Sequence, residues 1–167
     1  MFFICVQLLG LIGFVVSVVS YWNKDIKGIL YLQLISGFFY IIHYYFLGAI
    51  EGLLVVGIEL IRDFLYFKTE WSKYIFIGTI PFYVILGLEI YDGIISLYPL
   101  FASGVEGFGL SLKKSSAVVG AIISAGLWMV YDYVVGSYVG LITSLILFVS
   151  NMIIMFKYYW TECENIK

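Results

Sequence analysis

Three charged side chains lie within five residues of one another in an otherwise apolar stretch of the chain. Glu59, Arg62 and Asp63 are spaced so that a helix through this stretch places them on one face, where Arg62 can pair with either acid. A charge at the centre of a bilayer costs roughly 2.5–3.5 kcal/mol on insertion scales, so these groups require a protein interior or water around them. We expect them to form a gate or a coupling site. The alternative is an internally satisfied ion pair whose Arg62 reaches toward the cytosol.

Two aromatic side chains indicate a binding surface. Tyr40 and Trp128 lie inside apolar stretches rather than at their ends, and rings from two helices can sandwich a flat or sugar ring, with the indole N–H as a polar contact. Thr143 and Asn151 on the last apolar stretch add polar groups. We expect these four residues to bind a substrate. The alternative for the two rings is aromatic packing between helices.

His43 and Glu106 are two further candidates for gating or coupling. His43 lies about one turn inside the end of its helix, where it could take up protons and couple them to transport; a histidine hydrogen-bonded to a neighbouring helix is the role we favour. Glu106 lies in a Gly-rich segment, seven residues after Pro99. Because proline removes a backbone hydrogen bond, this helix is expected to bend during gating, unless the glycines serve close helix packing.

The composition indicates which solvent surrounds these residues. Of 167 residues, 63% are hydrophobic, 20% aromatic and only 12% charged, whereas soluble domains are about half apolar and about a quarter charged. This excess and a mean hydropathy of +1.05 predict an integral membrane protein. Cys5 and Cys163 give neither a disulfide framework nor a metal-ligand spacing, and a net charge of −2 argues against nucleic acid as a partner. The sequence contains no enzyme motif, so we expect no catalysis and no bound metal or cofactor.

Short loops divide the chain into seven predicted transmembrane helices, at about 2–22, 28–47, 51–67, 74–91, 93–110, 116–135 and 138–158. The lysines gather at the exits of the odd-numbered helices: Lys24, Lys27, Lys68, Lys73, Lys113, Lys114, Lys157 and Lys167. The loops at the other end contain no Lys or Arg. By the positive-inside rule, the N-terminus is predicted to lie outside and the C-terminus in the cytoplasm.

Sliding the chain against itself by 88 residues aligns its turns and loops. Seven positions across 28–68 are identical in this alignment, and they include Ser36 with Ser124, Gly48 with Gly136, and Gly52 with Gly140. The alignment predicts a three-helix bundle at 1–68, a linker helix at 74–91, a second three-helix bundle at 93–159 and a short cytoplasmic tail at 160–167. Because each bundle has an odd number of spans, a second bundle that followed the first directly would be inverted in the membrane. The linker helix restores the orientation, so the two bundles of this 3+1+3 arrangement are parallel repeats, as in the SWEET transporters.

A set of residues looks like the YgjV-type family of bacterial inner-membrane proteins: Gln7-x-x-Gly10, Asn23-x-Asp25, His43-x-x-x-Leu47-Gly48, Arg62, Trp128, Gly136-Ser137 and Asn151. The resemblance runs over roughly 7–68 and, more weakly, 120–157, and it implies a multi-pass protein of the bacterial inner membrane. More distantly, Trp128-x-x-Tyr131 followed by Tyr138-Val139 is similar to SWEET sugar facilitators, and PnuC-type vitamin transporters share that wider architecture. The Asn that SWEETs carry early in the last helix is Thr143 here, so the fold carries over better than the sugar specificity.

These features together predict a small-solute transporter that works by alternating access on a ring-bearing solute such as a vitamin, a nucleoside or a sugar. Its partners would be the lipid bilayer and that solute, and Gly-rich helix faces also allow a homo-oligomer. The main alternative is a membrane receptor or assembly partner that binds a peptide or protein without transporting anything. An ion conductance would need a continuous polar file, for which the last helix offers few groups.

Overall fold

Helices make up almost all of the described chain. The computed structural model describes residues 2–20, 26–69, 72–112 and 114–164, with the elements α1 (Phe2–Ser20), α2 (Ile26–Leu47), α3 (Ile50–Lys68), α4 (Ser72–Glu89), the 3₁₀ turn η1 (Ile94–Leu97), α5 (Tyr98–Leu110), α6 (Lys114–Val135) and α7 (Tyr138–Glu164). Over these ranges, the seven predicted helices are present as α-helices. Within the described residues, four helical stretches are long and apolar enough to cross a membrane: Phe2–Ser20, Leu30–Leu47, Val118–Val135 and Tyr138–Lys157.

The first helix shows how such apolar segments pack into a bundle. Its buried residues are mostly small or polar and recur every three or four positions: Val6, Gly10, Gly13, Ser17 and Ser20. This stripe faces α2, and the Ser36 hydroxyl donates to the Gly13 carbonyl at 2.8 Å. Small residues let two helix backbones approach closely, which is how membrane helices gain packing energy without a hydrophobic driving force. Large apolar side chains such as Leu8 and Val15 lie exposed, as expected for residues that face lipid.

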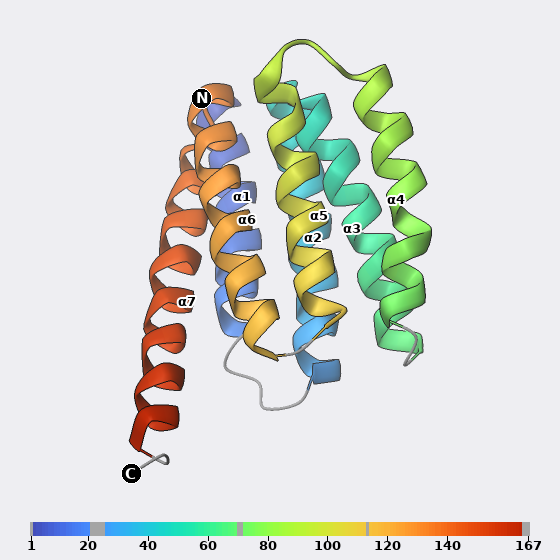
Figure 1. The fold of residues 1–167 in the computed structure, drawn as a ribbon. Coiled ribbons are helices and arrows are strands. Elements are labelled where there is room, and N and C mark those ends of the chain that lie inside the picture. The colour runs from blue at the N-terminus through green and yellow to red at the C-terminus, as the bar shows by residue number, and fades with distance from the viewer. Residues whose placement is uncertain (1, 21–25, 70–71, 113, 165–167) are drawn as a thin grey trace.

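Two groups of three helices pack in chain order. α1 packs against α2 and α2 against α3, while α5 packs against α6 and α6 against α7. We call α1–α3 the first triplet and α5–α7 the second triplet. Contacts of α1 with α7 and of α3 with α5 join the triplets, and α4 lies at one edge, against α3 and α5 (Figure 1). The space between the triplets is therefore bounded by helices from both.

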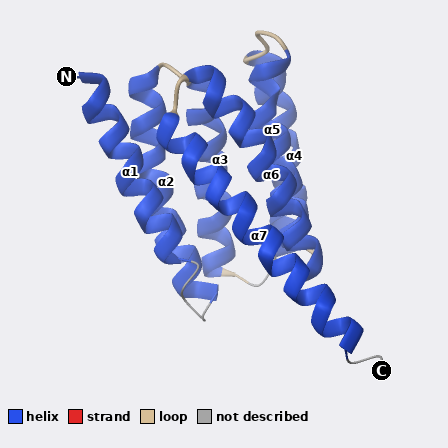
Figure 2. Ribbon diagram, turned by 90° about the vertical axis from the view of Figure 1, so that its left-hand side faces the viewer, coloured by secondary structure: helices blue, strands red, loops and turns tan. Residues whose placement is uncertain are grey.

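The described parts of the chain begin and finish at opposite ends of the bundle (Figure 1). One end holds the turns α2–α3 and α6–α7 and is called the turn end; the other holds Lys27, Lys68, Lys73 and Lys157 and is called the lysine end. Lys24, Lys113 and Lys167 lie outside the described residues. α7 runs obliquely past the other helices (Figure 2) and continues to Glu164 rather than stopping near 158, so 160–164 of the expected tail are helical.

The two turns at the turn end have the same geometry. Gly48 and Gly136 both have φ of 73°, a left-handed conformation that only glycine adopts without strain. In the first turn the amide of Ala49 donates to the Tyr44 carbonyl at 3.0 Å; in the second the amide of Ser137 donates to the Asp132 carbonyl at 2.9 Å. Each position in one turn is 88 residues from its counterpart in the other. The aligned glycines therefore close the same kind of helix terminus.

The position of Pro99 corrects the expectation that this residue bends its helix. Pro99 lies in the first turn of α5, where a backbone N–H has no partner within the helix, so it starts the helix and does not bend it. The preceding residues 94–97 form the 3₁₀ turn, which is why α5 begins at Tyr98 and not near 93. Pro81, in contrast, lies inside α4. A proline-induced irregularity is therefore expected in α4, away from the space between the triplets.

Candidate functional site

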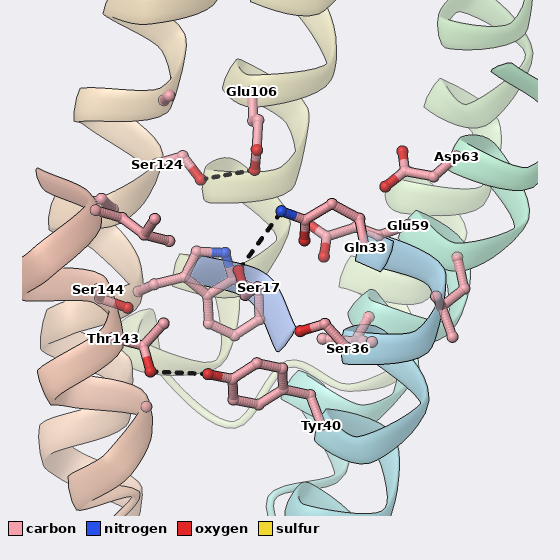
Figure 3. Close-up of a pocket in the computed structure, with 18 of the residues that line it drawn as sticks. Ser17, Gln33, Ser36, Tyr40, Glu59, Asp63, Glu106, Ser124, Thr143 and Ser144 are labelled. Carbon is pink, nitrogen blue, oxygen red and sulfur yellow. Dashed lines mark hydrogen bonds between the residues drawn. The ribbon is translucent and has the colours of Figure 1, made fainter. Parts of the chain in front are cut away.

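A cavity of about 440 Å³ lies between the two triplets. Six helices line it, all except α4. Its lining includes eight of the nine residues proposed from the sequence as substrate-binding or gating groups: Tyr40, Glu59, Arg62, Asp63, Glu106, Trp128, Thr143 and Asn151. Figure 3 shows several of them converging on the same space from opposite helices. Residues spread over more than a hundred positions therefore form one site.

The cavity lining is organised by the 88-residue offset. Most of its members occur as pairs at this separation, among them Leu30 with Val118, Ser36 with Ser124, Tyr40 with Trp128, Tyr44 with Asp132, Val56 with Ser144, Glu59 with Leu147 and Asp63 with Asn151. Both triplets thus present equivalent positions to the same space, although the residue types at those positions differ in most pairs.

Three aromatic rings form one wall of the cavity. Tyr44 stacks on Tyr40 with ring centroids 6.1 Å apart and on Trp128 with centroids 5.9 Å apart. The sequence analysis expected Tyr40 and Trp128 to face each other across a ligand. In the structure Tyr44 contacts both, so a flat ligand would lie against this wall and would enter between two of its rings only by displacing one.

Polar contacts connect the aromatic wall to α7. The hydroxyl of Thr143 donates to the Val139 carbonyl at 2.8 Å, which leaves its oxygen to accept a hydrogen bond from the Tyr40 hydroxyl, also at 2.8 Å (Figure 3). Further along α7, the Asn151 side-chain amide donates to the Leu147 carbonyl at 2.9 Å. The Asn151 carbonyl oxygen and second N–H are not used in that bond and can serve a polar solute.

The charged residues form a second wall, on α3 and α5. Arg62 Nε donates to Asp63 Oδ1 at 2.9 Å, and its Nη1 donates to the Ser103 carbonyl at 3.3 Å. Arg62 is only 2% exposed, so it is satisfied inside the protein and does not reach to the cytosol. Glu106 accepts a hydrogen bond from Ser124 at 3.2 Å. Glu59 Oε1 is buried and has no hydrogen-bond partner within the described part of the chain.

A layer of hydrogen bonds between the triplets closes the cavity at the turn end. The Tyr44 hydroxyl donates to Asp132 Oδ1 at 2.7 Å, and Ser144 donates to the other carboxylate oxygen at 3.3 Å. Beside them, the Tyr131 hydroxyl accepts from the Gly52 amide at 2.9 Å and donates to Glu51 at 3.2 Å. A buried side chain of α6 thus satisfies the first turn of α3.

His43 belongs to this closing layer and does not line the cavity. Its Nδ1 donates to the Val6 carbonyl at 2.8 Å, and its Nε2 lies 2.9 Å from the Ser137 hydroxyl. The ring is fully buried, so it joins α1, α2 and the start of α7 without contact with the aqueous phase. Gln7 strengthens the same junction by donating to the Gly136 carbonyl at 3.1 Å and accepting from the Val139 amide at 3.3 Å.

The burial of the cavity lining differs between its two ends. Tyr44, Asp132 and Thr143 at the turn end are buried, at 3%, 2% and 5% exposure. Leu30, Val118 and Asn151, which line the cavity nearer the lysine end, are half-buried. In this conformation, the lining is therefore buried more completely at the turn end than near the lysine end.

Sequence reasoning did not single out several polar residues of the lining, namely Ser17, Gln33, Ser36, Tyr44, Ser124 and Ser144. One available signal was the 88-residue offset, which pairs Ser36 with Ser124 and Val56 with Ser144. A second signal was the presence of uncharged polar groups within apolar spans, because such groups face the bundle interior far more often than lipid.

Membrane-spanning helices around an internal cavity define the protein as a polytopic membrane protein. The chain belongs to the Imp-YgjV family, whose sequence model, described as a bacterial inner membrane protein, matches residues 4–162. The resemblance to the YgjV-type family is thereby confirmed, and the protein is placed in the bacterial inner membrane. Comparison with curated proteins and with solved structures gives no match.

Proposed function

We propose that this protein transports a small solute across the bacterial inner membrane by alternating access, and that the structure has the form that faces the cytoplasm. One observation carries the proposal: a cavity of about 440 Å³, within the range of small-molecule sites, lies between two helix triplets, and its lining at the turn end is buried. The solute would lie against the aromatic wall and contact Tyr40, Trp128, Thr143 and Asn151.

The pattern of helix contacts supports a two-fold relation between the triplets. If α1, α2 and α3 correspond to α5, α6 and α7, then exchanging the triplets converts the contact of α1 with α7 into a contact of α5 with α3. Both contacts are present. A 3+1+3 arrangement of parallel repeats about an axis along the membrane normal accounts for this pairing and for the matching turns. Rocking of one triplet against the other, about a hinge axis that lies in the membrane plane, would open the turn end and close the lysine end.

The lysine distribution supports the orientation. With the lysine end in the cytoplasm, the N-terminus lies outside and the C-terminus inside, in accord with the positive-inside rule. Glu59, Arg62, Asp63 and Glu106 then lie on the cytoplasmic part of the route and serve as a gate. His43 would hold the outer junction closed rather than carry protons.

A side-specific labelling experiment tests alternating access without knowledge of the substrate. In a background with Cys5→Ser and Cys163→Ser, Asn151→Cys and Thr143→Cys would each be treated with a membrane-impermeant methanethiosulfonate in inverted and in right-side-out vesicles. We expect Asn151→Cys to react fastest from the cytoplasmic face and Thr143→Cys to react slowly from both faces. A Thr143→Cys variant that reacts only from the cytoplasmic face would contradict alternating access.

A flux measurement tests transport itself. Proteoliposomes loaded with a bacterial metabolite extract would be diluted into buffer, and the solutes lost from the lumen would be identified by mass spectrometry against protein-free liposomes. Selective loss of one solute or a small group of related solutes is the expected result. No loss, together with a stoichiometric protein co-purified from native membranes, would favour the receptor or assembly role instead.

A further inference from the structure

We propose that the cavity selects a monovalent organic cation whose positive charge is carried on or next to a flat ring. The inference rests on the proposed transport function and specifies the substrate class for the same cavity. Three observations carry it: an excess of carboxyl groups in the lining, two carboxyl groups outside the ion pair of Arg62, and an aromatic wall in the same cavity.

The first observation is the charge of the lining. Glu59, Asp63, Glu106 and Asp132 line the cavity, whereas Arg62 is the one basic side chain among the lining residues that the structure describes. The charge of Arg62 is matched by its 2.9 Å ion pair with Asp63. An anion or a second carboxylate brought into this space would meet several carboxyl groups and a basic side chain that is already paired.

The second observation concerns Glu59 and Glu106. The Glu106 carboxyl accepts one hydrogen bond, from Ser124, and within the described chain neither acid makes an ion pair with Lys or Arg. Glu59 Oε1 is buried without a partner, which costs free energy unless a ligand or water supplies a donor. A site that keeps such a group at a cavity wall is suited to a ligand that brings positive charge or an N–H to it.

The third observation is the aromatic wall formed by Tyr40, Tyr44 and Trp128. The face of an aromatic ring attracts a cation, and the attraction is strongest for Trp and increases when water is excluded. Trp128 lies on α6 and Glu106 on α5 of the same triplet, while Glu59 approaches from the other triplet. A flat cation lying on the rings would therefore have carboxyl groups from both triplets within the same cavity.

A neutral sugar fits these observations less well. Sugar sites provide many hydrogen-bonding groups for hydroxyls, and here the hydroxyls of Tyr40 and Tyr44 are already donated, to Thr143 and Asp132. The buried lining atom that lacks a hydrogen-bond partner within the described chain is Glu59 Oε1, a carboxyl oxygen, and an ionised carboxyl group only accepts. It matches a ligand that brings positive charge or an N–H, and the unused groups of Asn151 add one polar contact rather than the many that a sugar needs.

The test compares two small ring probes of the same shape that differ by one charge: 1-methylpyridinium-3-carboxamide, a cation, and 3-methylbenzamide, which is neutral. Affinities for the full-length protein in detergent would be measured by equilibrium dialysis. We expect the cation to bind at least tenfold more tightly than the neutral probe. Equal affinities, or tighter binding of the neutral probe, would overturn the inference.

Variants assign the effect to the named walls. Glu59→Gln and Glu106→Gln keep shape while removing charge, and together they should reduce the affinity for the cation at least tenfold while leaving that for the neutral probe within about twofold. Trp128→Leu should reduce the affinity for the cation more than Trp128→Phe does. Glu89→Gln, on an exposed residue at the end of α4, is the matched control and should change neither affinity. If the Glu variants bind neither probe, they are unfolded. The ratio of the two affinities in the wild-type protein would then decide alone.

The flux measurement separates this inference from the transport proposal. If the solute released from proteoliposomes is an organic cation, both stand. If it is neutral or anionic, transport stands and the cation inference fails. If no solute is released although the wild-type protein prefers the cationic probe, the cavity is a cation-binding site and the transport proposal fails.

Discussion

The hydroxyl of Tyr44 donates a 2.7 Å hydrogen bond to Oδ1 of Asp132, and the two residues are 88 positions apart. This separation equals the offset that aligns the two halves of the chain, so the bond joins equivalent positions of the two triplets. If the proposed two-fold relation holds, a contact between equivalent positions lies close to its axis. Tyr44 donates and Asp132 accepts, so the different residue types at these two positions form a bond between the triplets at the turn end.

Replacing Tyr44 with Phe should loosen this closure. Hydrogen bonds between membrane helices contribute about 0.6 kcal/mol on average and up to about 1.7 kcal/mol, and we expect the upper part of this range because the acceptor is a buried carboxyl group. The free energy of unfolding in detergent measures the change. Tyr44→Phe combined with Asp132→Asn should cost less than the sum of the two single changes, since both changes act on the same hydrogen bond: Asn accepts more weakly than a carboxylate, and Phe cannot donate.

The matched control for this substitution is the next residue. Tyr45 is 63% exposed, whereas Tyr44 is 3% exposed, so Tyr45→Phe should leave stability unchanged within about 0.5 kcal/mol. In the labelling experiment, Tyr44→Phe should also raise the rate at which Thr143→Cys reacts from the outer face. Additive effects of Tyr44→Phe and Asp132→Asn would show that the two side chains are not coupled.

The two turns at the turn end should respond equally to the same change. Gly48→Ala and Gly136→Ala each force a side chain into the left-handed region at φ 73°, which costs roughly 1–2 kcal/mol, although the new methyl group meets no atom within 4 Å in either turn. Gly126→Ala is the control, because this helical glycine also has open space and gains helix propensity. Thermal unfolding of the three variants checks the prediction, and a clear difference between the two turn variants would count against their equivalence.

Much of the fold could be predicted because short loops with turn residues separate the apolar helices. Gly48 and Gly136 marked two helix ends that the structure places in the same turn geometry. The start of α5 could not be predicted, because Ile94, Ile95 and Leu97 are as apolar in a 3₁₀ turn as in an α-helix. Hydropathy reports which solvent a segment prefers, and it does not report the hydrogen-bonding pattern of its backbone.

The cavity was harder to predict than the helices. Glu59, Arg62 and Asp63 were identifiable because charges in apolar segments must face the interior. The role of Tyr44 could not be identified from the sequence, because Tyr44 and Tyr45 have the same side chain and only the rotation of α2 makes one buried and the other exposed. His43 was a candidate for proton coupling by residue type alone, and its contacts with Val6 and Ser137 depend on the approach of α1 and α7, which are distant in the sequence.

Removing only one partner of the ion pair on α3 should destabilise the protein more than removing both. Arg62→Met leaves the half-buried Asp63 without its partner, and we expect a loss in the lower part of the range of about 3–5 kcal/mol found for buried pairs. Arg62→Met with Asp63→Asn removes both charges and should recover most of that loss. Lys68→Met, on an exposed residue at the end of α3, serves as the control with little effect. Unfolding free energies measure all three, and a double variant no more stable than Arg62→Met would show that Arg62 acts through other contacts.

The contact between Gly10 and His43 should be sensitive to a single methyl group. A Cβ at Gly10 would lie 2.9 Å from His43 Nδ1, and the histidine cannot yield easily because both of its nitrogens are engaged, with Val6 and Ser137. Gly10→Ala should therefore displace the ring and destabilise the protein by about 1–3 kcal/mol, as overpacked cores do. Gly78→Ala in α4, where a Cβ meets nothing within 4 Å, is the matched control and should be neutral. His43→Ala alone should also be destabilising, but adding Gly10→Ala to it should cost little, because the space is then empty. Thermal unfolding of the four variants decides the matter: if Gly10→Ala remains as damaging without the imidazole as with it, then α1 and α2 are held apart by something other than His43.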